Sequence, residues 1–412
     1  MEKKKTLRLA IINRSNLFFF YTTHHYYMPS PRRVVCIFFG LRDYLTVSNI
    51  CASVLVVAVS PQIMSDYRRT TVVVTGCSGY IGSCLTKKLC ELGFNVRGTV
   101  RSIHESRKID HLRDLCPLNP PILYTADLNI KGSFERAFDG ATYVLHTASP
   151  FFKHSRVKDP KKELIEPAVN GTLDVMEEAR KAGVKRVVIT SSANAVIDTS
   201  CAPIAEKVYD EKDWNPTTRP SYALSKVLAE KAAWKFSSEH PCAPELVSIL
   251  PGFTVGPPAS KRNDSESIRL IRNLLEGHMK HGSPPMSFGC VDVREVVDAH
   301  VNAMLIPTAK QQRYLCQSAH RHTFLEMANM LRDTADFKGY PLPKKYMANM
   351  KPAHPSKRHQ ISSEKIQIQL GIKLRPLKDS LVDMAKTMLE FGIIVDPSKT
   401  QKKNLRKAVS NL

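Results

Sequence analysis

The stretch Thr71-Val-Val-Val-Thr-Gly-Cys-Ser-Gly-Tyr-Ile-Gly-Ser83 joins a β-branched run to three evenly spaced glycines. The run from Thr71 to Thr75 is apolar or β-branched throughout, which is typical of a strand buried on both faces of a parallel sheet. Apolar residues then recur at the spacing of one helix face, at Ile81, Leu85, Leu89 and Leu92. Gly93 is a helix stop, and residues 94–99 are predicted to form the next strand. The stretch therefore predicts a strand–turn–helix–strand unit.

The three glycines stand where a bound dinucleotide needs them. A side chain at Gly76 or Gly79 would crowd the turn or keep a pyrophosphate away from the backbone, and Gly82 lets the helix pack closely on the strand. The N–H groups and the positive end of the helix then face the phosphates. A glycine-rich turn without a ligand is the alternative, but the strand before it and the helix after it favour a cofactor. We expect cofactor contacts from the whole turn: Gly76, Ser78, Gly79, Tyr80, Ile81 and Gly82.

The 412 residues suffice for one large α/β domain and a smaller lobe, and 43% hydrophobic and 24% charged residues are those of a soluble globular protein. The formal charge of +22 would also fit binding to nucleic acid or to an acidic membrane. Basic residues are nevertheless spread out, apart from Lys3–Lys5 and Lys399–Lys407, and no nucleic-acid-binding module is recognisable. We therefore interpret the chain as a basic enzyme with an anionic cofactor and predict no nucleic-acid partner.

The ten cysteines are scattered, with no CxxC pair and no metal-ligand spacing. Cys77, Cys84 and Cys90 fall inside the nucleotide-binding unit, where they are interpreted as small core residues. We interpret the cysteines as reduced thiols in a reducing compartment, predict no metal site, and expect a cytoplasmic protein.

Residues 1–65 do not show the sequence pattern of this fold. Residues 44–60 are largely apolar, but this run is short for a membrane span of about 20 residues and too far from Met1 for an ordinary signal peptide. A targeting segment, a weak membrane anchor and sequence absent from the native product are the alternatives. Met64 lies 7 residues before the first core strand, so we hypothesise that it is the functional start and that the preceding segment is disordered or non-native. An intact mass near that of the whole chain, measured on protein from its own cells, would contradict this hypothesis.

Arg101 ends the second predicted strand, where NAD-specific sites usually place an acid for the ribose 2′-hydroxyl. A cation there favours the 2′-phosphate of NADP through charge-assisted hydrogen bonds, and Arg107 and Lys108 follow it. The alternative is a surface arginine in a basic protein. Further along, the buried strand 143–146 runs into small residues that let the backbone approach a cofactor, Thr147, Ala148 and Ser149.

Two segments further along carry the residue types of acid–base chemistry. A predicted strand ends in Ser191 and Ser192, and open α/β sheets place their sites at the carboxyl ends of strands. Tyr222 and Lys226 open a predicted helix over 222–236, and their i, i+4 spacing puts both side chains on one face. Such a pair is common by chance, but this one gains weight because it follows both the glycine turn and the serine-ended strand.

The chemistry explains this combination of side chains. A tyrosine pKa near 10 is too high for an efficient acid or base at neutral pH, and we expect the Lys226 ammonium to lower the pKa of Tyr222. The same lysine can hold the nicotinamide ribose. Ser192 can hydrogen-bond the substrate oxygen and orient it for proton exchange with Tyr222, while a nicotinamide exchanges hydride with the carbonyl carbon.

Taken together, these segments resemble the dihydroflavonol reductase group of extended short-chain dehydrogenases/reductases, close to cinnamoyl-CoA reductases and related to 3β-hydroxysteroid dehydrogenases. The resemblance covers about residues 71–397. It implies a Rossmann-type, doubly wound parallel α/β sheet in 66–255, a mainly substrate-binding lobe in 256–397 with elements returning to the main domain, and a basic tail, 398–412. The segments that carry it are Val74–Ser83, Val96–Arg101, Ala126–Leu128, Leu145–Pro150, Thr190–Ala193, Tyr222–Glu230, Pro251–Pro257 and Val291–His300.

The resemblance also implies roles for single residues. It implies Ser192, Tyr222 and Lys226 as the catalytic triad, with Ser191 as the fallback for Ser192. Taken alone, Asp127 would be interpreted as a helix N-cap. The cofactor residues that the resemblance implies beyond the glycine turn are Arg101 and Lys108 at the 2′-phosphate, the pair Asp127 and Leu128 beside the adenine, and Pro251 beside the nicotinamide.

Two departures from the family pattern leave the substrate open. Ile197 stands where plant flavonoid reductases tend to carry a polar residue for the substrate hydroxyls, and residues 219–226 differ from the signature of cinnamoyl-CoA reductases. We predict an NADP-dependent oxidoreductase that interconverts a carbonyl and an alcohol on a small apolar or cyclic substrate, as a monomer or homodimer without a stable membrane span. The alternatives are a 3β-hydroxysteroid dehydrogenase-like enzyme, a sugar epimerase, for which no nucleotide-sugar signature is visible, and a non-catalytic NADP-binding sensor, which needs no proton donor.

Overall fold

The computed structural model describes residues 66–150, 158–350, 352 and 358–397, together with the backbone of four short strands. These strands form two antiparallel pairs, β1 (Ile11–Ile12) with β2 (Leu17–Phe18) and β3 (Phe38–Phe39) with β4 (Val54–Leu55). The chain divides into two units, Met1–Arg69 and Thr70–Leu412. Apart from the short strands, the predictions for residues 1–65 lie outside the described residues, as do those for the tail 398–412.

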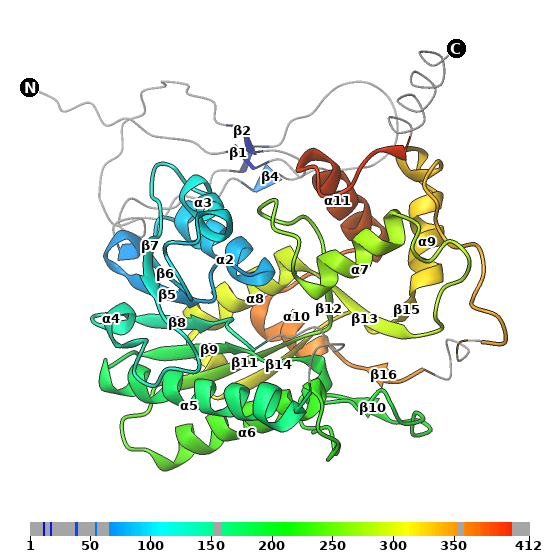
Figure 1. Ribbon diagram of the computed structural model, residues 1–412. Helices are drawn as coiled ribbons and strands as arrows, with labels where there is room; N and C mark the ends of the chain where they lie inside the picture. Colours follow the sequence, from blue (N-terminus) through cyan, green and yellow to red (C-terminus); the bar gives the residue numbers. More distant parts are fainter. Residues whose placement is uncertain are drawn as a thin grey trace, which may run out of the picture. The chain divides into compact units, whose positions relative to one another are not determined.

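A seven-stranded parallel sheet forms the centre of the second unit (Figure 1). Its strands in chain order are β5 (Thr71–Thr75), β6 (Asn95–Val100), β7 (Ile122–Thr125), β8 (Tyr143–His146), β9 (Arg186–Thr190), β11 (Glu245–Pro251) and β14 (Gln312–Cys316). In space they follow the order β14-β11-β9-β8-β5-β6-β7. The chain therefore builds outward from β5 through β6 and β7, and then returns to the other side of β5 with β8. This confirms the predicted doubly wound, Rossmann-type sheet, with its topological switch point between β5 and β8.

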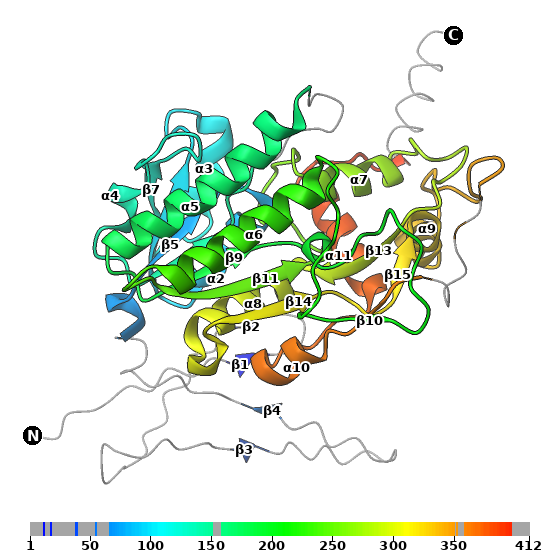
Figure 2. The same ribbon diagram turned by 90° about the horizontal axis from the view of Figure 1, so that it is seen from below.

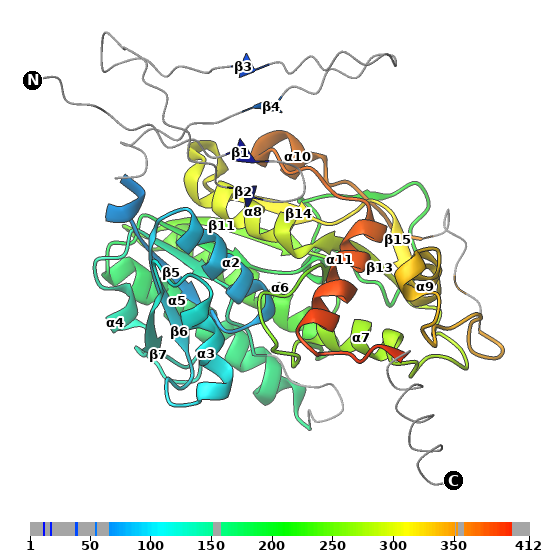
Figure 3. The ribbon, with the colours of Figure 1, turned by 90° about the horizontal axis from the view of Figure 1, so that it is seen from above.

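Helices cover both faces of this sheet. Figure 2 shows α5 (Glu166–Lys181) and α6 (Tyr222–Glu239) along one face, and Figure 3 shows α2 (Tyr80–Glu91) and α8 (Val293–Leu305) along the other. Two further helices connect strands along the chain: α3 (Ser106–Asp114) follows β6, and α4 (Glu135–Phe138) follows β7. Residues Val72–Val74 of β5 are fully buried, because a central parallel strand is covered on both sides.

One predicted helix begins differently from its pattern. The sequence predicts a helix over 163–182, and the structure places a π-helical turn, Lys161–Ile165, before α5. The N–H of Glu166 donates to the carbonyl of Lys161, five residues back, and not to that of Lys162 as in an α-helix. The next residue, Pro167, has no N–H to donate to the carbonyl of Glu163.

The smaller lobe is built on a three-stranded sheet with the order β12 (Phe253–Val255), β13 (Ser287–Asp292) and β15 (Arg321–Thr323). The helices α7 (Glu266–Leu275), α9 (Phe324–Arg332) and α11 (Leu377–Glu390) pack their apolar faces against each other and this sheet. The remaining elements are β10 (Val208–Tyr209), its parallel partner β16 (Gln360–Ile361), and α10 (Glu364–Leu370). The sequence predicts that a helix is entered from Val291, but β13 continues to Asp292, whose side chain caps α8 in a capping box with Glu295.

Register brings the site segments to one edge of the main sheet. Thr75 of β5 lies opposite His146 of β8, and His146 lies opposite Ile189 of β9. The glycine turn, the loop after β8 and the serines after β9 therefore all leave the sheet at the same edge. Among the described residues, we find no helix with both the length and the apolar character of a membrane span.

Candidate active site

The glycine turn between β5 and α2 is shaped for a phosphate. Gly76 has a φ of +64°, and a Cβ on it would lie 2.9 Å from the Cα of Ala148. A Cβ on Gly82 would lie 2.3 Å from the carbonyl oxygen of Gly76, so neither position accepts a side chain. The N-cap of α2 is Gly79, and no side chain caps this helix. The first N–H groups of α2 are thus left for a ligand anion, which fits a dinucleotide pyrophosphate.

The loop after β8 is fixed against this turn. The Thr147 hydroxyl donates to the carbonyl of Thr75 over 2.7 Å, and the N–H of Ala148 donates to the Thr75 hydroxyl over 3.2 Å. Ala148 also lies where a side chain on Gly76 would point, so the two backbones approach each other closely. The structure therefore brings the predicted residues Thr147, Ala148 and Ser149 beside the glycine turn.

The residues predicted at the adenosine end are spread over three segments. Arg101 is exposed directly after β6, while the side chain of Lys108, in α3, lies outside the described part of the chain. Asp127 accepts a hydrogen bond from the N–H of Asn129 over 2.9 Å, so it forms a local turn rather than a helix N-cap. The side chain of Leu128 packs over Gly171, where a Cβ would lie 2.8 Å from it.

The three candidate catalytic residues lie together at the carboxyl edge of the sheet. Ser192 follows β9 and is 8% exposed, and its hydroxyl is hydrogen-bonded to the partly buried side chain of Tyr222, the first residue of α6. Lys226 is also 8% exposed, and its Nζ donates to the carbonyl of Thr190 over 3.3 Å. The same Nζ lies 5.7 Å from the centre of the Tyr222 ring. The i, i+4 spacing thus does bring the phenol and the ammonium onto one face.

Burial sets the protonation of this group. It raises the pKa of Tyr222 to about 12, although the hydrogen bond with Ser192 acts in the opposite direction. Our expectation that the pKa of Tyr222 lies below its usual value is therefore wrong for this arrangement, because the loss of solvation outweighs the hydrogen bond with Ser192. Burial lowers the pKa of Lys226 to about 8, and the carboxylate of Glu230 partly counters this. At neutral pH Tyr222 carries its proton and Lys226 is mostly an ammonium.

The structure distinguishes Ser192 from Ser191, the alternative candidate for the catalytic serine. The Ser191 hydroxyl donates to Glu230 over 2.7 Å and not to Tyr222. Glu230 is 1% exposed and also accepts hydrogen bonds from the indole of Trp234 and from Arg313. Sequence reasoning missed this network. The position of Glu230, four residues after Lys226 in the same helix, was a signal for it, whereas Arg313 gave none.

Two buried histidines hold the strand ends. His146 lies 2.7 Å from the Thr75 hydroxyl, and His300 lies 2.7 Å from the Thr190 hydroxyl. The other ring nitrogen of His300 lies 2.7 Å from the carbonyl of Val296, which can only accept, so the Thr190 hydroxyl donates to Nε2. Burial lowers the pKa of His146 to about 3 and that of His300 to about 4, so both are neutral.

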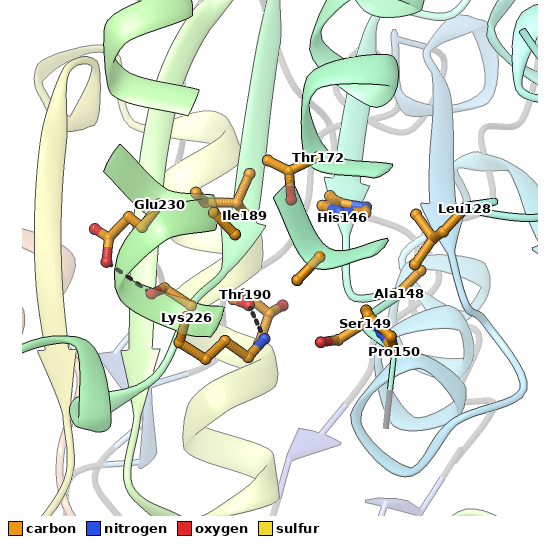
Figure 4. Close-up of a pocket in the computed structure, with 13 residues that line it drawn as sticks. Leu128, His146, Ala148, Ser149, Pro150, Thr172, Ile189, Thr190, Lys226 and Glu230 are labelled. Atoms are coloured by element: carbon orange, nitrogen blue, oxygen red, sulfur yellow. Dashed lines mark hydrogen bonds between the residues drawn. The ribbon is translucent and has the colours of Figure 1, made fainter. Parts of the chain in front are cut away.

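A pocket lies between the loops after β7 and β8 and the helix α6 (Figure 4). Leu128, Ala148 and Ser149 line one side, and Thr190 and Lys226 line the other. Ser192 and Tyr222 lie outside this lining. Pro251, the last residue of β11, ends at the same edge of the sheet, opposite Cys316 of β14. This arrangement combines an anion cradle, a proton donor and a cation within one site.

Relatives of known name match most of the chain. The model of the NAD dependent epimerase/dehydratase family matches residues 72–315. The chain is 35% identical over 326 residues to the cinnamoyl-CoA reductase CAD2 of Medicago truncatula, covering 77% of this chain and 95% of that protein. It is 32% identical over 343 residues to the bifunctional dihydroflavonol 4-reductase/flavanone 4-reductase of Pyrus communis, covering 80% and 93%. Among solved structures, that of Gre2 from Candida albicans in complex with NADPH is 30% identical, with a TM-score of 0.67, and covers 78% of this chain and 99% of its own.

The matched region contains the parallel sheet apart from its first residue, Thr71, and its last, Cys316. It also contains the glycine turn, Ser192, Tyr222 and Lys226. The two relatives match more than three quarters of the chain. The chain therefore belongs to the NAD dependent epimerase/dehydratase family, within its group of dihydroflavonol reductase-like and cinnamoyl-CoA reductase-like proteins.

Proposed function

We propose that the protein is an NADP-dependent oxidoreductase that interconverts a carbonyl and an alcohol on a small apolar or cyclic substrate. The observation that carries the proposal is the placement of Ser192, Tyr222 and Lys226 at the sheet edge that also bears the glycine turn. The names of the relatives support it, because cinnamoyl-CoA reductase, dihydroflavonol 4-reductase and the NADPH complex of Gre2 all point to this chemistry.

The proton chemistry follows from the states of the side chains. A substrate oxygen between the hydroxyls of Ser192 and Tyr222 accepts a hydrogen bond from each, which stabilises the negative charge that develops on it. Tyr222, protonated at neutral pH, gives its proton to that oxygen as the carbonyl becomes an alcohol. The Lys226 ammonium, held by the carbonyl of Thr190, then stabilises the phenolate. NADPH, when bound, supplies the hydride.

The residues that would hold NADP come from four loops. The glycine turn would bind the pyrophosphate, and Arg101 and Lys108 the 2′-phosphate. The pair Asp127 and Leu128 would lie beside the adenine. Thr147, Ala148, Ser149 and Pro251 would let the nicotinamide half approach Tyr222 and Lys226.

The cofactor assignment is tested by fluorescence titration with NADPH and NADH. We expect tighter binding of NADPH, and we expect Arg101→Ala to weaken NADPH binding about tenfold while NADH binding stays within about twofold, because only NADPH carries the 2′-phosphate. Arg113→Ala, which removes an exposed arginine from α3, is the matched control. Preference of the unmodified protein for NADH would contradict the assignment.

The reaction class is tested with a panel of aldehydes and ketones, followed by the absorbance of NADPH. Consumption of NADPH that requires one of these carbonyls is the expected result. Tight NADPH binding without consumption on any member of a broad panel would instead favour a binding protein without turnover.

A further inference from the structure

A segment of the smaller lobe, residues 256–265, lies against the glycine turn. The Tyr80 hydroxyl donates to the carbonyl of Gly256 over 2.6 Å. The guanidinium of Arg262 donates from Nη1 to the carbonyl of Ser78, also over 2.6 Å. Ser78 and Tyr80 flank Gly79, the N-cap of α2. The smaller lobe therefore holds both sides of the turn that would bind the pyrophosphate.

The guanidinium of Arg262 is fixed in place and retains donors. Its Nε and Nη2 donate to the carboxylate of Asp264 over 2.8 and 2.7 Å, and its side chain is 19% exposed. Three of its five N–H groups are thus engaged by Asp264 and Ser78. Among the described residues the other two, one on Nη1 and one on Nη2, have no partner.

A small pocket lies between the glycine turn and the segment 256–265. Ser78, Gly79 and Tyr80 form one wall, and the other includes Ser260, Arg262, Asp264 and Ser265. Ser265 is the N-cap of α7, so the N-termini of α2 and α7 both border the pocket. The N-terminus of α2, which no side chain caps, and the guanidinium favour an anion there, whereas the N-terminus of α7 is capped by the Ser265 side chain.

The charged groups around this pocket act in both directions. The Asp264 carboxylate offsets part of the positive charge of Arg262, and it also holds the orientation of the guanidinium group. Glu266 is paired with Arg269 on α7, and neither residue lines the pocket. On the side of α3, burial and the nearby Arg262 charge keep the pKa of His111 below its usual value, so this histidine is neutral at pH 7. Arg262 thus faces the turn from the smaller lobe as a cation and donates a hydrogen bond to it.

We propose that Arg262 binds the pyrophosphate of the dinucleotide, so that the smaller lobe closes over the cofactor as well as over the substrate. The inference rests on the proposed function. Its target is the pyrophosphate and not the 2′-phosphate, because Arg262 binds a carbonyl inside the glycine turn, whereas Arg101 stands at the end of β6.

The test compares Arg262→Ala with Arg269→Ala in the full chain. Arg269 is a matched control, since it is also paired with an acid in the same lobe but lies on the helix beyond the pocket. Dissociation constants for NADPH and NADH are measured by fluorescence titration at rising NaCl concentrations. We expect Arg262→Ala to weaken both nucleotides about tenfold and to make binding less sensitive to salt, and Arg269→Ala to change both by less than about twofold.

Thermal unfolding without nucleotide shows whether each variant folds. If Arg262→Ala does not fold, Arg262→Lys decides: it keeps the charge but not the paired fork, so both nucleotides should weaken several-fold while the salt dependence is retained. Unchanged affinity in a folded variant, or a loss confined to NADPH, would overturn the proposal. Failure of the unmodified protein to bind either nucleotide would instead overturn the proposed function.

Discussion

At the scale of residues, burial acts on Tyr222 and Lys226 in opposite directions. It keeps the phenol protonated and brings the ammonium within reach of physiological pH. The carboxylate of Glu230, one helical turn beyond Lys226, supports the charged form of the lysine. The site is thereby prepared to donate a proton, which is the state that the proposed carbonyl reduction requires.

The first prediction concerns pH. Because the pKa of Lys226 is lowered to about 8, kcat/KM for carbonyl reduction should be level below pH 7 and fall as pH rises through about 8, where the ammonium is lost. The titration of Tyr222, at about 12, lies beyond this range. Lys226→Arg, whose side chain stays charged, should remove the fall if it retains turnover. A profile that stays level to pH 10 in the unmodified protein would exclude this role for Lys226.

At the scale of elements, the unit from β5 to α2 depends on close approach of backbone to backbone. A Cβ at Gly82 would meet both the Gly76 carbonyl and the Thr147 hydroxyl, so the turn, the helix and the loop after β8 share one tight contact. The cofactor cradle is therefore a property of three elements together.

Gly82→Ala should disturb this contact. We expect a loss of about 1–3 kcal/mol in the free energy of unfolding and at least a tenfold loss of nucleotide affinity, because the turn must shift to admit the methyl group. Gly339→Ala is the control, since a Cβ there would meet nothing within 4 Å and the backbone is unstrained. Urea unfolding and nucleotide titration measure both effects, and equal behaviour of the two variants would refute this account of the turn.

Elements with their own periodic pattern were predictable from the sequence. β5, α2 and the start of α6 lie where the β-branched run, the apolar helix face and the Tyr222 motif put them. β10 and β16 have two residues each and pair across about 150 residues, so no local pattern predicts them. The role of Arg262 could not be predicted from a local pattern either. Its hydrogen bond to Ser78 spans 184 positions and forms only when the smaller lobe packs against the main sheet.

At the scale of the whole molecule, buried neutral histidines tie the sheet edge together and make stability depend on pH. The pKa of His300 is lowered to about 4 in the folded protein, so the unfolded chain binds a proton near its normal pKa of about 6.5 that the folded protein does not. Stability is then lost as pH falls below about 6.5. Glu295 acts with the opposite sign, because burial raises its pKa to about 7.

Comparison with a variant isolates the histidine. From pH 7 to pH 5 the free energy of unfolding of the unmodified protein should fall by about 2 kcal/mol relative to that of His300→Gln, because the variant has no proton to take up on unfolding at this position. His278→Gln, at an exposed histidine, should leave the pH dependence unchanged. Parallel pH profiles for His300→Gln and the unmodified protein, measured by urea unfolding, would show that the buried histidine is not the source.

The central claim is that the Tyr222 hydroxyl delivers the proton in carbonyl reduction. Its most direct test is the rate of carbonyl-dependent NADPH consumption by Tyr222→Phe, with NADPH affinity measured on the same preparation. We predict a fall in kcat of at least about 100-fold, the usual contribution of a general acid, with NADPH affinity within about twofold of the unmodified protein. Unchanged turnover in Tyr222→Phe would contradict the account.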